Sequence, residues 1–505
     1  MELDKSKPST HEDKSYRLLG FDTAGELFVH DEKILRGIYP EYETLYRNIL
    51  ETCEKNQFST LGIVKTWEFN GTLSQDENFN LVLEHERIPF ITYPHEWPAT
   101  MLKDAALFHI GLFIQLEKYG LILKDWHPYN ILFKNTDPVF IDFLSIIPID
   151  ALKNVDYLNP LHTPLFFGSI WDTHAKYLFE MYQRMYLPFI LLPLELMVQK
   201  KYNQARKRML QTTLNASTTT ISPHEVFGFN IFKRVLFGER ESIKKISLIN
   251  RAHFSHKFFK FLIRELNHLD IKPASSDYVK YYELKNENFD FKPTAEWTNK
   301  QVVVYNTIQQ LKPLTVLDVA CNTGWFSILA AKNGCEVVAI DIDEASINWL
   351  YEYVKTEHLT ILPLVIDITR SNEEIFPIVQ NESIYQKRLT KSTPLIKSVE
   401  NRLQCDMVLV LALIHHLALG QNMSFTQLFK ILGILSKKYL ILEFVPKNDD
   451  LIISDPDFFP AYKLDPNSFE WYTLENLVNE LKKVFKTIEI VDSYPETRKL
   501  LICKK

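Results

Sequence analysis

The sequence has few cysteines, and they form no recognisable motif. It holds five in 505 residues, an odd number with no CxxC spacing. They are Cys53, Cys321, Cys335, Cys405 and Cys503. Because disulfide frameworks belong to oxidising compartments, we expect a reduced compartment and a cytoplasmic location.

Long apolar runs are also missing. The most apolar stretch is Met185–Val198, which contains two prolines and Glu195. It is shorter than the roughly 20 residues that a transmembrane helix needs, so we expect a buried helix and no membrane span. The first 17 residues are polar and charged, without the apolar centre of a secretory signal.

Neither sign of charge dominates the chain. It has 57 Lys and Arg against 63 Asp and Glu, a formal net charge of −6. This balance argues against a protein that wraps nucleic acid, so we expect no nucleic-acid partner. The length favours two or three domains, and the 46% of hydrophobic residues is typical of globular proteins.

The first part of the chain changes pattern twice. Residues 1–15 are expected to form a disordered tail. Residues 16–150 combine alternating apolar segments, a helix that starts at Pro40, further strands and a long apolar helix that ends at Gly120. This order predicts a small domain of strands and helices that leads into a polar loop.

The rest of the chain divides near residue 296. Residues 151–295 read as helices and a linker, with a polar Ser/Thr-rich loop at 212–224. Residues 296–505 alternate apolar strands with helices, which predicts an α/β, Rossmann-like parallel sheet with helices on both faces. The last two strands are joined by a short turn and predict an antiparallel hairpin at the sheet edge.

The first strand of this C-terminal region is followed by small residues. In "LDVACNTG", Asp318 ends or follows the strand, and the chain then passes through small residues into a helix near Trp325. Ala320, Asn322 and Gly324 can each allow a close backbone approach to a ligand. A nicotinamide-binding turn would need G-x-G-x-x-G, which is absent. For Asp318 alone, a helix N-cap is the alternative.

Two more acids follow the next strands. Asp341 ends the second strand, about twenty residues after the turn, where a carboxylate can accept both hydroxyls of a ribose. Asp367 ends the third strand and is placed to meet an adenine amino group. The following Ile368 is expected among the cofactor contacts. An N-cap role for one acid does not explain three acids at three successive strand ends.

Two adjacent histidines lie just past the fourth strand, in "LALIHHLAL". Imidazole is well suited to take a proton from a hydroxyl or amine near neutral pH, so His415 and His416 are candidate catalytic bases. The alternative is that one packs and the other binds the backbone. We expect no metal here, because adjacent histidines should point apart and no third ligand is evident. Glu443 and Lys447 follow the fifth strand, as substrate-side, lid or merely solvated residues.

A second constellation lies in the N-terminal region, in "LKDWHPYNILFKNTDPVFIDF". The spacing of Asp125 and Asn130, with Asp142 further on, is that of a kinase catalytic loop and its metal-binding acid. A structural turn is the alternative. No glycine-rich phosphate loop appears, since Gly20 and Gly25 stand alone. The strand lysine with which a kinase contacts the nucleotide phosphates is also missing, and Arg36 is its nearest counterpart.

We expect Glu41 or Glu43, in the following helix, to pair with Arg36. "DWHPYN" is especially similar to the loop of aminoglycoside-phosphotransferase-like kinases. With the N-terminal half of the machinery incomplete, we expect a kinase-like site that does not transfer phosphate. We expect weak or absent binding of Mg-ATP.

The turn after the first strand resembles that of class I S-adenosylmethionine (SAM)-dependent methyltransferases, acid-x-Gly-x-Gly-x-Gly, with Ala320 and Asn322 in place of two glycines. Over the whole chain, "GLILKDWHPYNILF", "VLDVACNTGWFSILAA" and "LALIHHLAL" resemble a family of bacterial class I methyltransferases with nodulation-associated members. The resemblance implies a Rossmann-like methyltransferase domain preceded by a kinase-like α+β domain with a helical extension. A lengthened segment, 373–402, precedes the fourth strand and is expected to line the acceptor site.

The prediction is therefore a SAM-dependent methyltransferase with a degenerate kinase-like domain. Its acceptor would be a hydroxyl or amine of a small molecule or glycan. A bifunctional kinase and methyltransferase, and a non-enzymatic SAM-binding scaffold, remain as alternatives. Protein partners and oligomeric state are not indicated by the sequence.

Overall fold

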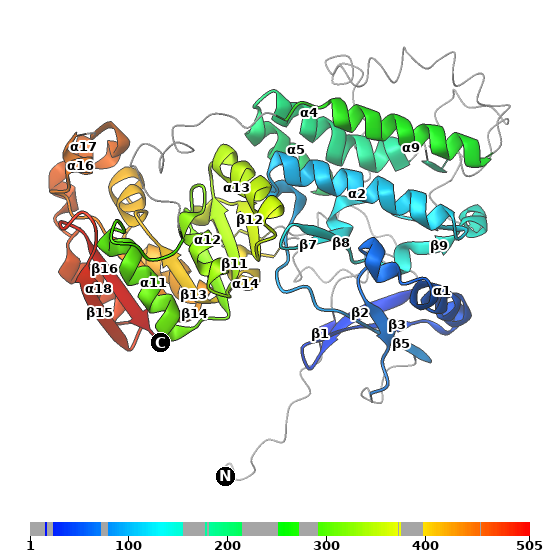
Figure 1. The fold of residues 1–505 in the computed structure, drawn as a ribbon, viewed down its shortest axis with the longest axis horizontal. Helices are drawn as coiled ribbons and strands as arrows, with labels where there is room; N and C mark the ends of the chain where they lie inside the picture. Colours follow the sequence, from blue (N-terminus) through cyan, green and yellow to red (C-terminus); the bar gives the residue numbers. More distant parts are fainter. Residues whose placement is uncertain are drawn as a thin grey trace, which may run out of the picture.

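The computed structural model describes residues 16–17, 24–71, 79–154, 177–178, 181–214, 251–271, 291–371, 373–374, 397–454 and 456–505. The chain folds into an N-terminal part, residues 16–271, and a C-terminal part, residues 291–505, which lie side by side (Figure 1). The expected tail at 1–15, Gly20, and most of the segments 212–224 and 373–402 fall outside the described residues.

The N-terminal part begins with a five-stranded antiparallel sheet in the order β1-β2-β3-β5-β4. Its strands are β1 (Tyr16–Arg17), β2 (Gly25–His30), β3 (Lys33–Ile38), β4 (Thr66–Glu68) and β5 (Leu81–His85). Between β3 and β4, a short 3-10 turn at Pro40–Tyr42 leads into helix α1 (Glu43–Lys55), which buries Tyr46 and Ile49. The predicted strands and helix are confirmed.

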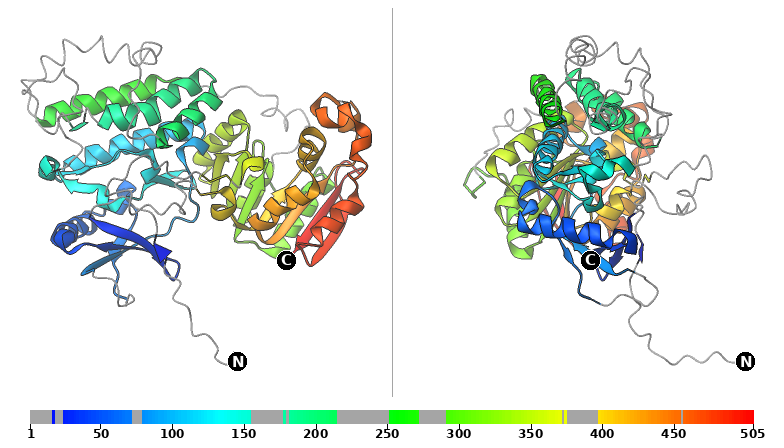
Figure 2. Two further views of the ribbon diagram at one scale, coloured as in Figure 1. Left: turned by 180° about the vertical axis from the view of Figure 1, so that it is seen from behind. Right: turned by 90° about the vertical axis from the view of Figure 1, so that its right-hand side faces the viewer.

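The second half of the N-terminal part is mainly helical, as predicted. Its helices are α2 (Ala99–Glu117), η9 (Tyr182–Leu191), α4 (Leu192–Val198), α5 (Tyr202–Leu214) and α9 (Arg251–His268). Two small antiparallel pairs, β6 (Leu121–Leu123) with β9 (Ile146–Pro148) and β7 (Ile131–Lys134) with β8 (Asp137–Phe140), hold the loop that carries Asp125. Figure 2 shows the helices stacked on the far side of these pairs from the five-stranded sheet. Together, the two halves have the layout of a kinase-like fold.

Helix α2 is the one helix of the described residues long and apolar enough to cross a membrane, with a mean hydropathy of 1.2. In the structure it is a core helix, since Met101, Leu102 and Leu116 are fully buried. The stretch singled out from the sequence, Met185–Val198, runs through η9 and α4 and packs into the same core.

The C-terminal part is built on a seven-stranded sheet in the order β12-β11-β10-β13-β14-β16-β15. The strands are β10 (Thr315–Val319), β11 (Glu336–Asp341), β12 (Ile361–Val365), β13 (Cys405–Val410), β14 (Ser436–Phe444), β15 (Thr487–Asp492) and β16 (Lys499–Lys504). The first five are parallel, and β16 is antiparallel to both of its neighbours. The predicted edge hairpin is confirmed.

Helices cover both faces of this sheet, because side chains of a strand point alternately to each side. Val316 packs under α11 (Asn299–Leu311), α12 (Trp325–Lys332) and α13 (Glu344–Glu357). Leu317, next along the strand, faces the other side, which carries α15 (Phe425–Leu435) and α18 (Leu474–Leu481). Shorter helices follow β12, precede β13 and follow β14: η10 (Ile368–Arg370), α14 (Val399–Arg402), α16 (Asp450–Ser454) and α17 (Pro460–Leu464).

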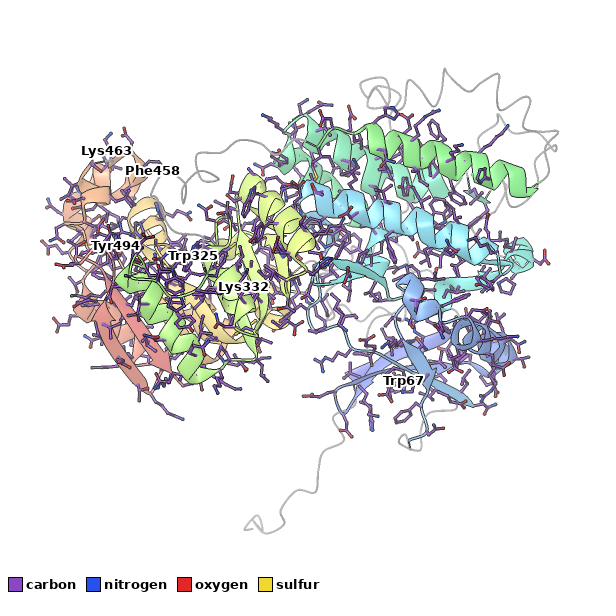
Figure 3. All side chains as sticks on the ribbon, viewed as in Figure 1. Trp67, Trp325, Lys332, Phe458, Lys463 and Tyr494 are labelled. Atoms are coloured by element: carbon purple, nitrogen blue, oxygen red, sulfur yellow. The ribbon has the colours of Figure 1, made fainter. Side chains whose placement is uncertain are left out.

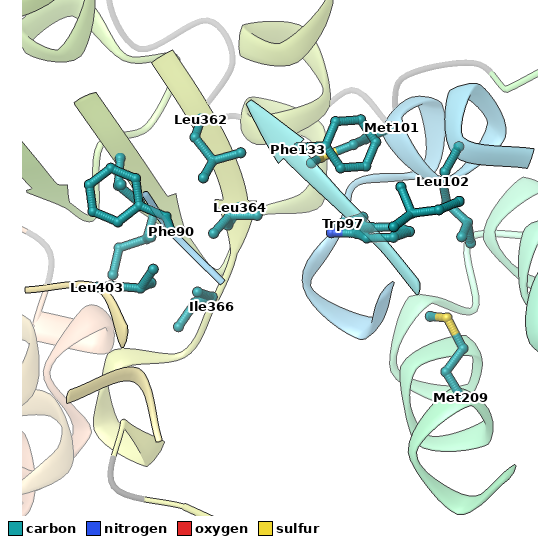
Figure 4. Packing of buried hydrophobic residues seen from close by; sticks show 14 of the residues in the cluster. Phe90, Trp97, Met101, Leu102, Phe133, Met209, Leu362, Leu364, Ile366 and Leu403 are labelled. Atoms are coloured by element: carbon teal, nitrogen blue, oxygen red, sulfur yellow. The ribbon is translucent and has the colours of Figure 1, made fainter. Parts of the chain in front are cut away.

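The two parts share one apolar core. Phe90, in the segment after β5, packs beside Leu362, Leu364 and Ile366 of the β12 strand and its end, and beside Leu403 (Figure 4). These residues belong to the same cluster of buried side chains as Trp97 and Met101 of the N-terminal part. We name this contact the shared core.

Polar contacts add to the shared core at the start of α2. The α2 N-cap, Pro98, supplies no side-chain acceptor. Instead, Glu344 of α13 accepts the N–H of Ala99 at 2.8 Å, and Asn348 accepts that of Thr100 at 2.9 Å. Unpaired N–H groups at a helix start need such acceptors, so the C-terminal part caps a helix of the N-terminal part.

Candidate functional site

The loop between β10 and α12 has an unusual backbone. Ala320, Asn322 and Gly324 have φ angles of 58°, 54° and 79°, three left-handed residues within five. Left-handed backbone costs a residue with a Cβ about 1–2 kcal/mol, so two non-glycine residues here store strain. The loop therefore adopts the conformation that a glycine-rich cofactor turn requires, although two of its glycines are replaced.

Gly324 is the residue of this loop that cannot carry a side chain. It is the N-cap of α12, and a Cβ on it would lie 2.6 Å from a methyl carbon of Leu350 in α13. The close approach of α12 and α13 thus depends on glycine in addition to its positive φ.

Asp341 lies at the end of β11, as predicted, and faces the loop. Its carboxylate accepts the N–H of Asn322 at 2.8 Å and that of Asp343 at 2.9 Å. Burial raises the pKa of this carboxyl, and the two N–H bonds oppose the rise. Asp341 therefore links the end of β11 to the loop after β10.

Asp318 was expected at or just past the strand end but lies inside β10. Its carboxylate is buried and accepts the Ser327 hydroxyl at 2.6 Å. Burial raises its pKa to about 7, against the opposing effects of Ser327 and Lys300. Asp318 is not the N-cap of α12, because Gly324 holds that position.

Asp367 and Ile368 follow β12 by two and three residues. Asp367 is exposed and N-caps η10, where it accepts the N–H of Thr369 at 3.0 Å. Ile368 lines a narrow apolar cavity with Leu413 and Leu417 from the segment after β13. At the neighbouring strand end, Ile342 is 70% exposed, an open apolar surface next to Asp341.

His415 and His416 lie after β13, at the carboxyl edge of the sheet. Their ring centroids are 4.2 Å apart, and the His416 ring stacks on Phe459 at 5.3 Å. The expectation that adjacent histidines point apart was wrong, because the helical turn that starts here brings both rings against Phe459. Among the described residues, no group of three His, Cys, Asp or Glu side chains could hold a metal ion.

The two histidines differ in their surroundings. His415 is fully buried, and neither ring nitrogen has a hydrogen-bond partner among the described residues. Burial holds the pKa of His415 well below its usual range, and it also lowers the pKa of the partly exposed His416. Both imidazoles are therefore neutral near pH 7, and His416 is the more accessible.

Glu443 was expected after the fifth strand and instead lies inside β14, fully buried. Its carboxylate binds the Lys300 ammonium at 2.9 Å and the Ser493 hydroxyl at 2.7 Å. The strand continues through Glu443 to Phe444, because Lys300 neutralises the buried acid. Lys447 donates to the backbone carbonyl of Phe469 at 2.9 Å.

Three charged residues near the site were missed in the sequence. Arg498 binds Asp449 through two bonds of 2.9 Å. Burial opposes the ionisation of Asp449, but Arg498 and Thr497 outweigh it and hold its pKa at about 2. The third is Lys300, whose position in the first turn of α11 is a signal, because helix starts favour acids over bases.

In the N-terminal part, the structure brings Asp125 and Asn130 together. Asp125 accepts the side-chain N–H of Asn130 at 3.3 Å and the backbone N–H of His127 at 2.9 Å. The N–H of Asp125 in turn lies 3.0 Å from the Ser145 hydroxyl. Both carboxylate oxygens of Asp125 thus bind their own loop, the use expected of a turn residue.

Arg36 and Asp142 meet across the kinase-like site. A guanidinium nitrogen of Arg36 lies 3.4 Å from a carboxylate oxygen of Asp142. The expected helix partners were wrong, because Glu43 binds Arg47 at 2.9 Å and neither Glu41 nor Glu43 pairs with Arg36. The acid expected to hold a metal ion therefore has a protein cation beside it.

Known proteins resemble the chain in both regions. The family described as "Tellurite resistance protein TehB" matches residues 282–383. The nodulation protein NoeA of Rhizobium meliloti (strain 1021) is 25% identical over 448 residues, which cover 85% of each chain. The TehB match spans the left-handed loop and Asp341, and the sheet around them ends in the antiparallel strand β16 followed by β15. The C-terminal part is a class I SAM-dependent methyltransferase.

Two solved structures also resemble a part of the chain. Magnesium protoporphyrin IX methyltransferase (ChlM) from Synechocystis PCC 6803, solved with bound S-adenosylhomocysteine (SAH), is 15% identical with a TM-score of 0.27. That match covers 45% of this chain and 97% of ChlM. The bifunctional kinase-methyltransferase WbdD is 15% identical with a TM-score of 0.29, and the match covers 45% of this chain and 42% of WbdD.

Proposed function

We propose that the methyltransferase part transfers a methyl group from SAM to a hydroxyl or amine of a small molecule or glycan. SAM supplies the activated methyl group, and the protein supplies alignment of acceptor, methyl and sulfur. The kinase-like part is proposed to be a scaffold that does not transfer phosphate. A cytoplasmic location remains a prediction that rests on the five cysteines, all of which are free and buried.

One observation carries the cofactor proposal. The loop after β10 is left-handed at Ala320, Asn322 and Gly324, and Asp341 faces it from the next strand end. Such a loop lets a ligand approach the backbone, and a carboxylate at the second strand end suits the hydroxyls of a ribose. The exposed Ile342, and the apolar cavity that Ile368 helps to line, offer apolar surfaces for an adenine ring.

His416 is the proposed general base. It is neutral near pH 7 and partly exposed at the carboxyl edge of the sheet, so it can accept the proton of an acceptor hydroxyl or amine. His415, packed beneath it, and Phe459 hold the ring in place. In this proposal His415 positions the base and takes no proton itself.

The cofactor site is tested by calorimetry with SAH. Replacing Asp341 by Ala should weaken binding about tenfold or more, because a hydrogen bond to a charged group is worth about 1.5–3 kcal/mol. Glu357→Ala is the matched control, since Glu357 is an exposed acid at the far end of α13. Equal affinity in wild type and Asp341→Ala would remove the ribose assignment.

The kinase-like proposal rests on Arg36 and Asp142. Their contact places a guanidinium where a phosphoryl-transfer site needs a metal ion. An arginine is also a poor substitute for the lysine that reaches nucleotide phosphates. The methyl acceptor itself is best sought by incubating the protein with labelled SAM and a metabolite extract, then following the label.

A further inference from the structure

Lys300 occupies an unusual place for a lysine. It lies in the first turn of α11, where the positive end of the helix dipole disfavours a cation. Its side chain is only 15% exposed, and its ammonium binds the fully buried Glu443 at 2.9 Å. A buried base at a helix start, with an acid inside a strand as partner, is a costly arrangement that calls for a reason.

The surroundings of Lys300 connect the two ends of the proposed site. Burial raises the pKa of Asp318 on the loop side and lowers that of His415 on the acceptor side; the charge of Lys300 opposes the first shift and adds to the second. The ammonium also lies 5.5 Å from the ring centre of Phe326, the second residue of α12. Lys300 is therefore placed between the cofactor loop and His415, the neighbour of the proposed base.

The Lys300 ammonium also has more N–H donors than it has acceptors among the described residues. An ammonium has three N–H groups, and among the described residues one of them binds Glu443. The other strong cation nearby, Arg498, already forms a two-bond pair with Asp449. The charged groups named beside the loop, Asp318, Asp341 and Asp343, are acids. Of these two cations, Lys300 is thus the one with capacity for a ligand anion.

We propose that Lys300 binds the carboxylate of the methionine moiety of SAM. This inference rests on the proposed function. The amino-acid end of SAM carries an ammonium and a carboxylate, and Asp318 and Glu443 supply negative charge beside a single cation. Glu443 neutralises Lys300 within the protein, and the ligand carboxylate adds a second acceptor to the same ammonium.

The competing explanation is that the pair only ties α11 to β14. The proposal and this competing explanation are distinguished by comparing the binding of SAH with that of 5′-methylthioadenosine. The second ligand has the adenosine and the sulfur but no amino-acid end. A residue that binds the carboxylate affects the first ligand alone. A residue that only holds the fold affects both ligands, because both use the same loop and strand ends.

The experiment is calorimetry of both ligands with wild type, Lys300→Met and Lys332→Met. Lys332, in the last turn of α12, is the matched control: it also lies over a phenylalanine ring, Phe291 at 5.2 Å, but is exposed (Figure 3). Lys300→Met should weaken SAH about tenfold or more and leave 5′-methylthioadenosine within about twofold. Lys332→Met should change neither.

A second variant covers the case in which Lys300→Met fails to fold because Glu443 is left unpaired. The double variant Lys300→Met/Glu443→Gln removes both charges and should show the same selective loss of SAH affinity. Equal weakening of both ligands, or no weakening of SAH, overturns the inference while wild-type binding of SAH stands. Failure of the wild type to bind either ligand overturns the proposed function as well.

Discussion

Arg402 forms a bidentate ion pair with both carboxylate oxygens of Glu96 across the boundary between the two parts of the chain. One guanidinium nitrogen lies 3.0 Å from Oε2 and the other contacts Oε1, with both side chains at most 5% exposed. The first nitrogen also donates to the carbonyl of Ile91 at 2.8 Å. The guanidinium lies 4.8 Å from the ring centre of Tyr93, whose hydroxyl accepts the N–H of Lys397 at 2.9 Å.

Breaking this pair should destabilise the whole chain. Glu96→Ala leaves Arg402 charged and buried without its partner, which costs about 3–5 kcal/mol of unfolding free energy. Chemical denaturation measures the loss. Glu86→Ala is the control, because its pair with Lys134 is exposed and should cost no more than about 1 kcal/mol. Similar losses in the two variants would show that the Glu96 pair is not the stronger tie.

The affinity for SAH should depend on pH through Asp318. Its pKa is about 7 because of burial, so the carboxyl is largely neutral at pH 5.5 and ionised above pH 7. The ligand ammonium favours the ionised form, so affinity should rise as pH increases toward about 7 and then level off. Calorimetry at several pH values tests this, and Asp318→Asn should bind more weakly with a flat profile. A slope that persists in Asp318→Asn assigns the titration to another group.

The raised pKa of Asp318 should make the free energy of unfolding fall as pH increases, whereas it makes the affinity for SAH rise. A carboxyl whose pKa rises on folding favours the folded state below its unfolded pKa, 3.8. That contribution is lost as pH rises from there through about 7, because the unfolded state releases its proton first. Asp318→Asn should remove this part of the pH dependence in denaturation experiments.

Methyl transfer should depend on His416 and not on the polarity of His415. His416→Ala is expected to lower transfer of labelled methyl into a metabolite extract by about 10²-fold or more, with SAH affinity intact. His415→Phe should keep the fold and most activity, because it fills the space and removes two unpartnered nitrogens. The assignment fails if His416→Ala transfers methyl groups at the wild-type rate.

The kinase-like site should neither hydrolyse ATP nor require it. We expect no rise in melting temperature with Mg-ATP for wild type or Asp142→Asn, and methyl transfer that is independent of ATP. The reason is the Arg36 guanidinium beside Asp142. Stabilisation by Mg-ATP that disappears in Asp142→Asn, together with a phosphorylated product, would instead make this a bifunctional enzyme.

Local pattern was enough to predict much of the fold and the cofactor loop. Apolar runs separated by helices predicted the parallel strands, and the short turn "YPETR" predicted the hairpin of β15 and β16. Small residues after β10 indicated the turn, and Ala320 and Asn322 take the backbone that glycine would.

Pairs that are distant in sequence could not be predicted in this way. Lys300 and Glu443 are 143 positions apart, and Glu96 and Arg402 are 306 apart. In a sequence, a buried acid inside a strand is easily taken for the end of the strand until its cation is known, which is why Glu443 was placed after the fifth strand. The partner of Arg36 was missed for the same reason, since the expected partners were Glu41 or Glu43 and the fold supplied Asp142.

The shared core has a consequence for anyone who wishes to shorten this protein. A methyltransferase that began near residue 296 would lose Phe90 and expose Leu362, Leu364, Ile366 and Leu403 to solvent. Such a contiguous apolar face promotes aggregation. Helix α13 would also lose the N–H groups of α2 that now satisfy Glu344 and Asn348. A shortened enzyme would therefore need polar substitutions on β12 before it could be produced as a monomer.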